Sequence, residues 1–380
     1  MESLVKEKII NLAETLSNKK PEEHKAVIGL DGFVDEILHV VATRKNAQEY
    51  QRLSSMKEYG ERIVQAAGLS TNIEMVRIQE KLGGNGPILS NALASYGIGL
   101  TYIGCVGYPH IEKVFDPMSK ICNILSVANP GHTDAVEFDD GKIMVGKQDT
   151  LKEVNWENIK KIIGVPKLIE LINESKLLGL ENWTMLPYMS EIWKGLLSEV
   201  LPHVKPLDQK RYVFFDLADP EKRTKEDIIE ALNLIKSFSD YFNVILGLNL
   251  KEAVEIADIL GFEEYDPQNI KNIDLKKLVE QVAGKLGIYC LVVHPTTEAA
   301  TVINGEYFQV TGPYTAKPKL TTGAGDNFNA GFCLGQMLDL SPEQSILLGV
   351  ATSGYYVRNA CSPTLGNVVE FLKMWSADQV

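Results

Sequence analysis

A run of small residues in the last fifth of the chain has the clearest chemical meaning in the sequence. Residues 320–331 read Leu-Thr-Thr-Gly-Ala-Gly-Asp-Asn-Phe-Asn-Ala-Gly, and a helical pattern begins inside this run. The first N–H groups of a helix lack partners within the helix, so Gly323, Ala324 and Gly325 should present donors at the positive end of its dipole. Glycine also lets a bulky anion approach the backbone. The run therefore predicts a site for a phosphoryl group.

Asp326 follows these residues in the first turn of the same predicted helix. A carboxylate beside a phosphate is electrostatically unfavourable unless it has a task, and the natural task is to accept the proton of an attacking hydroxyl. An acidic residue in the first turn also stabilises a helix through its dipole alone. Spacing by itself leaves both interpretations open.

The same run resembles the second signature of the ribokinase/PfkB carbohydrate kinases, in which Gly-Ala-Gly-Asp supplies an anion hole and a base. Other segments fall in the order of that family. Gly-Gly-Asn-Gly at 83–86, with the following helix and residues 97–107, is similar to the first glycine signature. Asn-Leu-Lys-Glu at 249–252 resembles the Asn-x-x-Glu element, and Asp35 resembles the sugar-binding aspartate. The resemblance extends from about residue 26 to residue 360.

This resemblance implies transfer of the γ-phosphoryl group of ATP to a hydroxyl of a small sugar or related polyol. Asp326 would be the general base, and the amides of Gly323, Ala324 and Gly325 would form the anion hole. The other implied roles are substrate binding by Asp31, Asp35, Gly84 and Asn85, nucleotide binding by Asn249, Glu252, Thr322 and His294, and organisation of Mg²⁺ and its waters by Asn249 and Glu252. Mg²⁺ suits such a site because it binds through few carboxylates and keeps several waters.

Structural roles compete with two of these assignments. Asn249 and Glu252 have the spacing of a helix N-cap and its capping-box glutamate, although one pair can serve both purposes. Asp31 follows the apolar strand predicted at 26–30 and could simply terminate it. The sequence leaves both of these alternatives open.

Four departures from the family pattern bear on specificity and activity. Leu320 stands where the family usually has an acid, and Ile88 where many members have a sugar-binding asparagine. His-Pro-Thr-Thr-Glu-Ala at 294–299 replaces the usual glycine-containing nucleotide loop, and residues 47–80 are longer than the common lid region. The alternatives are therefore a nucleoside or other small-alcohol kinase of the same fold, or a catalytically silent sugar-binding or regulatory relative.

Elements of alternating type position these residues. Helical periodicity predicts helices at 2–18 and 87–96, mostly helical structure over 47–80, and three C-terminal helices at 324–338, 342–358 and 367–377. After residue 175, predicted strands at 176–181, 211–216, 242–246 and 288–293 alternate with helices. Strands joined by helical crossovers form a mostly parallel sheet that is covered on both faces.

Two further segments predict hairpins. Short apolar runs surround Asp-Asp-Gly-Lys within 135–145, and a second pair surrounds Asn304-Gly305. We expect a single ribokinase-like α/β domain over 1–380, with a mostly parallel central sheet flanked by helices and a small β-rich lid formed by segments near 36–82 and 129–150. Lid strands of this family often pair between subunits, so the resemblance also suggests a homodimer through the lid.

Composition constrains the partners. Acidic residues outnumber basic ones by 50 to 38, and the net charge of −12 opposes binding to a nucleic-acid backbone. No apolar run approaches the roughly 18 residues of a membrane span, and the N-terminal residues do not resemble a signal peptide. The five cysteines are scattered and lack metal-binding spacing. We expect a soluble, cytoplasmic protein whose partner is a small sugar or polyol rather than nucleic acid or membrane.

Overall fold

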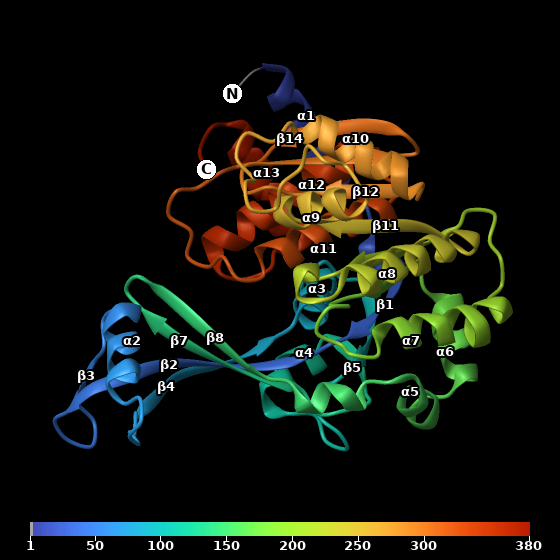
Figure 1. The fold of residues 1–380 in the computed structure, drawn as a ribbon. Coiled ribbons are helices and arrows are strands. Elements are labelled where there is room, and N and C mark those ends of the chain that lie inside the picture. The colour runs from blue at the N-terminus through green and yellow to red at the C-terminus, as the bar shows by residue number, and fades with distance from the viewer. Residues whose placement is uncertain (1–2) are drawn as a thin grey trace.

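A nine-stranded sheet runs through the body of the molecule (Figure 1). The computed structural model describes residues 3–380. The strand order is β14-β13-β12-β11-β10-β9-β1-β5-β6; neighbours from β12 to β6 are parallel, and β13 and β14 are antiparallel to their neighbours. The strands are β1 (Lys25–Leu30), β5 (Gly99–Gly104), β6 (Cys122–Ser126), β9 (Leu177–Leu180), β10 (Arg211–Asp216), β11 (Phe242–Leu248), β12 (Cys290–Val293), β13 (Glu298–Ile303) and β14 (Glu306–Thr311).

Helices cover both faces of this sheet, because its strands are apolar on both faces. In β10, Val213 and Phe215 pack into one hydrophobic core and Phe214 packs into the other. One core includes α5 (Trp156–Ile162), α6 (Val165–Glu174), α7 (Met189–Gly195), α8 (Lys225–Ser237), α9 (Leu250–Ile259) and α10 (Leu275–Leu286). The other includes α1 (Ser3–Leu16), α3 (Asn85–Ser95), α4 (Asp116–Ser119), α11 (Ala324–Met337), α12 (Pro342–Asn359) and α13 (Leu365–Ser376).

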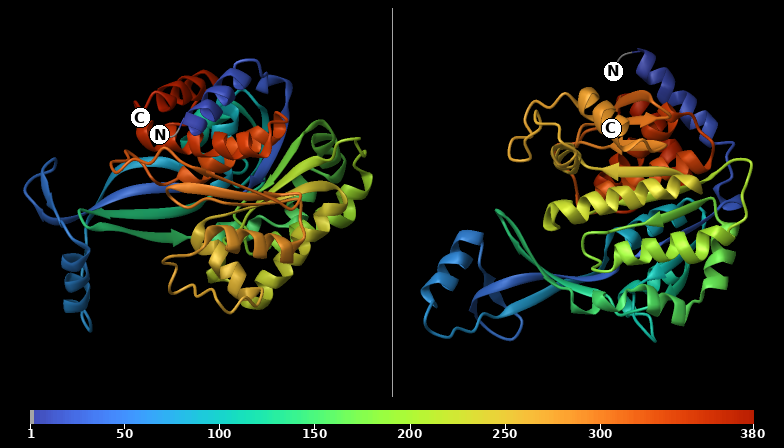
Figure 2. Two further views of the ribbon diagram at one scale, coloured as in Figure 1. Left: turned by 90° about the horizontal axis from the view of Figure 1, so that it is seen from above. Right: turned by 45° about the vertical axis from the view of Figure 1, so that its right-hand side comes forward.

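A second sheet forms an arm that projects from the body (Figures 1 and 2). It contains β2 (Phe33–Arg44), β3 (Tyr50–Arg52), β4 (Met75–Gly83), β7 (Gly131–Phe138) and β8 (Gly141–Lys147), with the helix α2 (Met56–Gln65) beside them. Leu38, Val40, Val136 and Phe138 form its own small core. The arm thus has a small hydrophobic core that is separate from the two cores of the main body.

Most predicted elements are confirmed, including the parallel sheet, the helices at the C-terminal end and both hairpins. At the turn between β13 and β14, Asn304 and Gly305 have φ values of 51° and 84°, which is why the turn uses these two residues. The helical prediction for 47–80 is wrong except at α2, since the segment also contains β3 and β4. The strand β4 is largely exposed, so pairing with β2 rather than an internal apolar pattern makes it a strand.

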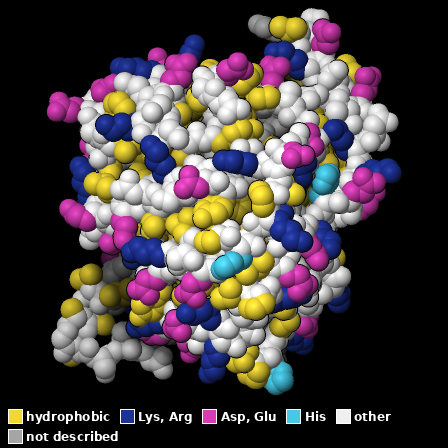
Figure 3. Space-filling view, turned by 90° about the vertical axis from the view of Figure 1, so that its right-hand side faces the viewer, with side chains coloured by type: hydrophobic (Ala, Val, Ile, Leu, Met, Phe, Trp, Pro, Cys, Tyr) yellow, Lys and Arg dark blue, Asp and Glu magenta, His cyan; other side chains and the backbone are white. Residues whose placement is uncertain are grey.

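The cysteines, the helices and the distribution of surface charge complete the description of the fold. The five cysteines are free, and four of them are buried. Within residues 3–380, no helix has both the length and the apolar character needed to cross a bilayer. On the face seen in Figure 3, cationic and anionic side chains are interspersed, with short hydrophobic runs between them.

Candidate active site

Polar residues follow the carboxyl ends of neighbouring parallel strands and meet at one edge of the central sheet. These residues are Asp31 after β1, Glu181 and Asn182 after β9, Asp216 at the end of β10, Asn249 after β11, and His294 after β12. The N-termini of α3 and α11 lie at the same edge, because Asn85 and Asp326 are hydrogen bonded. Small ligands of open α/β sheets bind at this edge, so it is the candidate active site.

Asp31 ties three segments together. Its Oδ1 accepts from the Gly86 amide at 2.8 Å, and its Oδ2 accepts from the Asn85 amide at 2.9 Å and from Asn182 Nδ2 at 2.8 Å. Burial raises the pKa of Asp31 to about 6, although these hydrogen bonds oppose the shift. Asp31 therefore does more than terminate a strand: it fixes the start of α3 against β1 and β9.

The glycine-rich turn at 83–86 is shaped around the carboxylates of Asp31 and Asp35. A Cβ atom on Gly83 would lie 2.5 Å from the Asp35 carboxylate. A Cβ on Gly84 or Gly86 would lie 2.8 Å from an oxygen of Asp31, and Gly84 also has a φ of 101°. Any larger side chain would displace a carboxylate, which explains why glycines occur here.

Asp326 lies in the first turn of α11, with its carboxylate facing α3. Its Oδ1 accepts from Asn85 Nδ2 at 3.0 Å. Burial raises the pKa of Asp326 to about 7; the Asn85 hydrogen bond lowers it, and the charge of Asp31 raises it. A carboxyl group with this pKa can take up or release a proton near neutral pH.

The predicted anion loop is partly free to bind a ligand. Gly323 is the N-cap of α11 with a φ of 87°, and the Ala324 amide donates to the Thr321 carbonyl at 3.1 Å. Within the described part of the chain, the amides of Gly323 and Gly325 have no hydrogen-bond acceptor. These two donors fit an anion best, whereas the Ala324 amide is already engaged.

Near Asp326 lies a pair of buried carboxyl groups whose role the sequence interpretation did not identify. Glu181 is 0% exposed, and neither of its oxygens has a hydrogen-bond partner among the described residues. Asp216 accepts from Asn329 Nδ2 at 3.2 Å. Burial raises the pKa of both carboxyl groups well above the usual range, and the charge of Asp216 adds to the effect on Glu181. The sequence feature that could have revealed this pair is that an acidic residue, Glu181 or Asp216, stands at the end of each of two neighbouring apolar strands.

Asn249 and Glu252 form the capping box that their spacing predicts. Asn249 Oδ1 accepts from the Glu252 amide at 3.0 Å, and Glu252 Oε2 accepts from the Asn249 amide at 2.9 Å. Glu252 Oε1 also accepts from the Asp219 amide at 3.0 Å. Across residues 3–380, no three His, Cys, Asp or Glu side chains are grouped so as to hold a metal ion. The donors here are hard oxygen ligands, which fit Mg²⁺ only if it is bound mainly by water and substrate phosphates.

A cleft of about 440 Å³ opens beside the anion loop. Asn249 and His294 line it together with Ala324 and Gly325 of α11, and Phe328 forms part of its apolar wall. The His294 ring lies 4.7 Å from the ring of Phe328, and burial lowers its pKa to about 4, so the imidazole is neutral. Of the nucleotide residues predicted from sequence, Asn249 and His294 thus face this cleft.

Thr322 lies next to the cleft and is contacted by the arm. Lys142, the second residue of β8, donates from Nζ to Thr322 Oγ1 at 2.9 Å. Tyr356 of α12 donates to the Thr322 carbonyl at 2.8 Å. The anion loop is therefore held from α12 on one side and from the arm on the other.

Comparison with known proteins decides the family. The profile of the prokaryotic ketohexokinase family matches residues 5–375. The chain belongs to this family. A ketohexokinase of Haloferax volcanii is 27% identical over 370 residues, which are 96% of each chain.

Solved structures show that this family member has the ribokinase fold. The adenosine kinase of Sinorhizobium meliloti has a TM-score of 0.63 at 18% identity and covers 93% of this chain and 99% of its own. An Arabidopsis thaliana ribokinase complexed with ribose and ATP has a TM-score of 0.59 at 18% identity and covers 92% and 98%. The resemblance to PfkB carbohydrate kinases is confirmed: the protein is a ketohexokinase-like sugar kinase, a phosphotransferase with an alcohol acceptor.

The structure shows where two of the departures of this ketohexokinase-family chain lie. Ile88 lies against the anion loop, since a Cβ on Gly323 would lie 3.2 Å from Ile88 Cγ2. Leu320 lacks the carboxylate that the family usually has at this position. The amides of Lys319 and Leu320 instead donate hydrogen bonds to the Val357 carbonyl of α12, at 2.7 and 3.4 Å. Main-chain bonds thus position the loop without the missing carboxylate.

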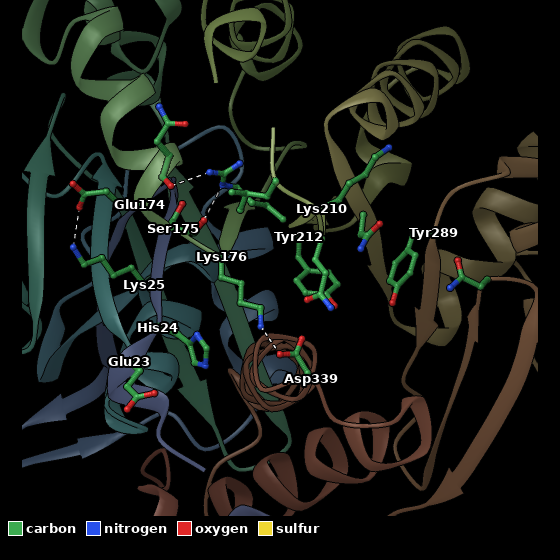
Figure 4. A pocket seen from close by; sticks show the side chains of 16 residues that line it. Glu23, His24, Lys25, Glu174, Ser175, Lys176, Lys210, Tyr212, Tyr289 and Asp339 are labelled. Atoms are coloured by element: carbon green, nitrogen blue, oxygen red, sulfur yellow. Dashed lines mark hydrogen bonds and ion pairs between the residues drawn. The ribbon is translucent and has the colours of Figure 1, made fainter. Parts of the chain in front are cut away.

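A larger hollow than this cleft lies at the opposite edge of the sheet in this family member (Figure 4). It has a volume of about 620 Å³ and lies where β1, β9 and β10 begin. Two ion pairs lie in it, Lys25 with Glu174 at 2.8 Å and Lys176 with Asp339 at 2.8 Å. Size therefore does not identify the active site here; the convergence of polar strand ends does.

Proposed function

We propose that this protein transfers the γ-phosphoryl group of ATP to a hydroxyl of a ketohexose. One observation carries the proposal: the buried carboxylate of Asp326 directly follows Ala324 and Gly325, which line the 440 Å³ cleft, and accepts a hydrogen bond from Asn85, whose own amide donates to Asp31. The relative from Haloferax volcanii, which matches along almost the whole chain, is itself a ketohexokinase.

The ketohexose would bind on the side of Asp31 and Asp35. Carboxylates accept hydrogen bonds from sugar hydroxyls, and the Asn85 amide group adds donors beside them. Burial raises the pKa of Asp35, while the ammonium groups of Lys81 and Lys142 and a hydrogen bond to Thr133 oppose this shift. The turn at 83–86 would form the floor, and the apolar Ile88 beside it disfavours the asparagine-dependent pocket of a ribokinase.

ATP would occupy the cleft next to the anion loop. Phe328, Val350 and Pro313 offer apolar surface to the base. The unpaired amides of Gly323 and Gly325 would then bind the phosphate that is transferred, helped by the dipole of α11. His294 and Asn249 would contact the nucleotide between these regions.

Mg²⁺ would join this complex through the nucleotide phosphates. When bound, it would offset the negative charge of those phosphates. Asn249 and Glu252 would orient its waters rather than bind it directly, since both oxygens of Glu252 already accept backbone hydrogen bonds. This keeps most of the hydration shell of the ion, as Mg²⁺ prefers.

Asp326 would act as the general base. As the hydroxyl oxygen of the ketohexose attacks the γ-phosphorus, its proton passes to the carboxylate, and the bond between the γ-phosphorus and the bridging oxygen of ADP breaks. The arm would act as the lid that excludes water from this site and so favours the sugar over hydrolysis.

Release of ADP from ATP and Mg²⁺ in the presence of a panel of sugars tests this function. The panel should contain ketohexoses, matched aldohexoses, pentoses and nucleosides. We expect turnover with a ketohexose at least tenfold above that with its matched aldohexose. Preference for a nucleoside would support the alternative kinase, whereas ATP binding without any turnover would support a silent binding protein.

A further inference from the structure

Lys142 lies at the tip of the arm and reaches the anion loop of the body. It is the second residue of β8, just after the turn at Asp139-Asp140, and its register partner on β7 is Glu137. Its Nζ lies 2.9 Å from Thr322 Oγ1, next to the N-terminus of α11. A side chain of the projecting sheet is thus placed at the proposed phosphoryl site.

We propose that Lys142 is a catalytic residue that binds the phosphoryl group while it passes from ATP to the sugar. This proposal rests on the proposed function. One contact locates the ammonium group, the hydrogen bond from Lys142 Nζ to Thr322 Oγ1 at the nucleotide side. Its charge also lowers the pKa of Asp35 on the sugar side, against the larger effect of burial, which agrees with this position. The path of the phosphoryl group runs between these two sides.

The charge of Lys142 is available for a ligand. Among the described residues, no carboxylate forms an ion pair with Lys142, and its hydrogen-bond partner is a neutral hydroxyl. Lys147, at the other end of the same strand, is bonded to Asp134 at 2.9 Å. Asp31, Asp35 and Asp326 at this edge of the sheet are buried carboxyl groups, so a phosphate beside their ionised forms would be repelled unless a cation were supplied.

The chemistry requires no proton from Lys142. The oxygen–phosphorus bond to ADP breaks, the bond from the sugar oxygen to phosphorus forms, and Asp326 takes the hydroxyl proton. The ammonium group stays protonated throughout and stabilises the charge on the three non-bridging oxygens of the phosphoryl group in the transition state. When a phosphoryl group is present, these oxygens would replace the Thr322 hydroxyl as acceptors.

This placement couples closure of the arm to the reaction. Lys142 belongs to the lid, whereas the anion loop, Asp326 and the nucleotide cleft belong to the body. The catalytic set is complete only when the tip of the arm lies over α11. An open arm would therefore leave ATP bound but without the cation, which would limit hydrolysis by water.

Lys142→Met and Lys147→Met test the proposal, because they remove the same charge from the two ends of one strand. For Lys142→Met we expect kcat to fall roughly 100-fold, with KM for the ketohexose changed only a few-fold, while Lys147→Met retains kcat within about threefold of wild type. Lys142→Arg should recover part of the loss. Both methionine variants should keep the wild-type melting temperature to within a few degrees.

Binding of a transition-state analogue distinguishes a catalytic role of Lys142 from a structural one. ADP with aluminium fluoride, an analogue of the transferring phosphoryl group, should bind wild type in the presence of the ketohexose at least tenfold more tightly than it binds Lys142→Met. ADP alone should bind both equally. A kcat for Lys142→Met within threefold of wild type, or equal losses in both variants, would overturn the role of Lys142. Lack of activity in the wild-type protein with every sugar would instead overturn the proposed function.

Discussion

Asp326 and Glu181 are both buried carboxyl groups at the same edge of the sheet, yet their surroundings differ. Asp326 retains a hydrogen bond from Asn85, and its pKa is raised to about 7. Glu181 has no hydrogen-bond partner in the described structure, and its pKa is raised well above the usual range. At neutral pH, only Asp326 can readily ionise and serve as a base.

The pH dependence of activity follows from this pKa. Burial favours the protonated form of Asp326, and the base must be ionised, so kcat/KM should rise about tenfold per pH unit below pH 7 and level off above it. The measurement is kcat/KM for the ketohexose from pH 5 to pH 9. Asn85→Ala is the matched comparison: loss of its hydrogen bond, which lowers the pKa of Asp326, should move the acidic limb to higher pH. An acidic limb that stays in place in Asn85→Ala would contradict this explanation.

For individual residues, the sequence could predict positions that depend only on the neighbouring backbone. The place of Gly323–Asp326 at the start of a helix could be predicted because helix-start signals are local in the sequence; the roles of these residues are those that we propose. Glu181 and Asp216 could not be placed, since their proximity depends on the register between β9 and β10. Lys142 was also missed, because its contact joins residues 180 positions apart.

The turn at 83–86 shows how one element determines the site. It connects β4 of the arm with α3 of the body, and its glycines surround two carboxylates. The hydrogen bonds of Asp31 to the amides of Asn85 and Gly86 fix where α3 begins. The position of Asn85, and therefore its contact with Asp326, depends on this turn.

Gly83→Ala tests that dependence. Its Cβ would lie 2.5 Å from the Asp35 carboxylate, so we expect a loss of about 1–3 kcal/mol in stability and at least a tenfold rise in KM for the sugar. Gly60→Ala in α2 is the control: nothing lies within 4 Å of its added Cβ, and helix propensity should raise stability by about 0.5–1 kcal/mol. Chemical denaturation and steady-state kinetics measure both effects. Wild-type KM in Gly83→Ala would show that Asp35 does not contact the sugar.

The error over 47–80 has a physical cause at the same scale. The segment is rich in charged residues that favour helices. Because β4 exposes most of its side chains, its sequence lacks the alternation of apolar and polar residues that would identify a strand. It becomes a strand because β2 offers a free edge beside it. The parallel strands of the body were easier to predict, since burial on both faces requires apolar runs.

The buried carboxyl groups make the stability of the whole molecule depend on pH. Glu181 and Asp216 are protonated in the folded protein at pH values where they ionise in the unfolded chain. The folded state then holds more protons, so the free energy of unfolding should fall as pH rises above about 4.5, by up to about 1.4 kcal/mol per pH unit for each group.

Glu181→Gln removes one of these groups. Its free energy of unfolding relative to wild type should increase from pH 5 to pH 8, because only the wild-type side chain must remain protonated to stay buried. Denaturant titrations at several pH values measure this difference. The same substitution at the exposed Glu306 should give no such trend. A difference for Glu181→Gln that does not change with pH would contradict the protonated state assigned to Glu181.

The arm also bears on the assembly of the molecule. It exposes apolar side chains, with Val64 72% and Leu69 80% exposed, and Ile78, Met144 and Val145 each 48–49% exposed. Exposed apolar surface on a projecting sheet favours association with another subunit. We expect a homodimer in solution, to be measured by light scattering after size-exclusion chromatography. Ile78→Asp should weaken the dimer, whereas Ile229→Asp on α8 should not; a monomeric wild-type protein would contradict this assembly.

The most direct test of the account is the turnover of Asp326→Asn with ATP, Mg²⁺ and the ketohexose that wild type prefers. Asparagine has nearly the same shape but cannot accept the hydroxyl proton. We predict that turnover falls by about 10²–10⁴-fold, while the melting temperature and the affinity for ATP stay close to wild type. Turnover within a few-fold of wild type would contradict the assignment of Asp326 as the base, and with it the central claim about this site.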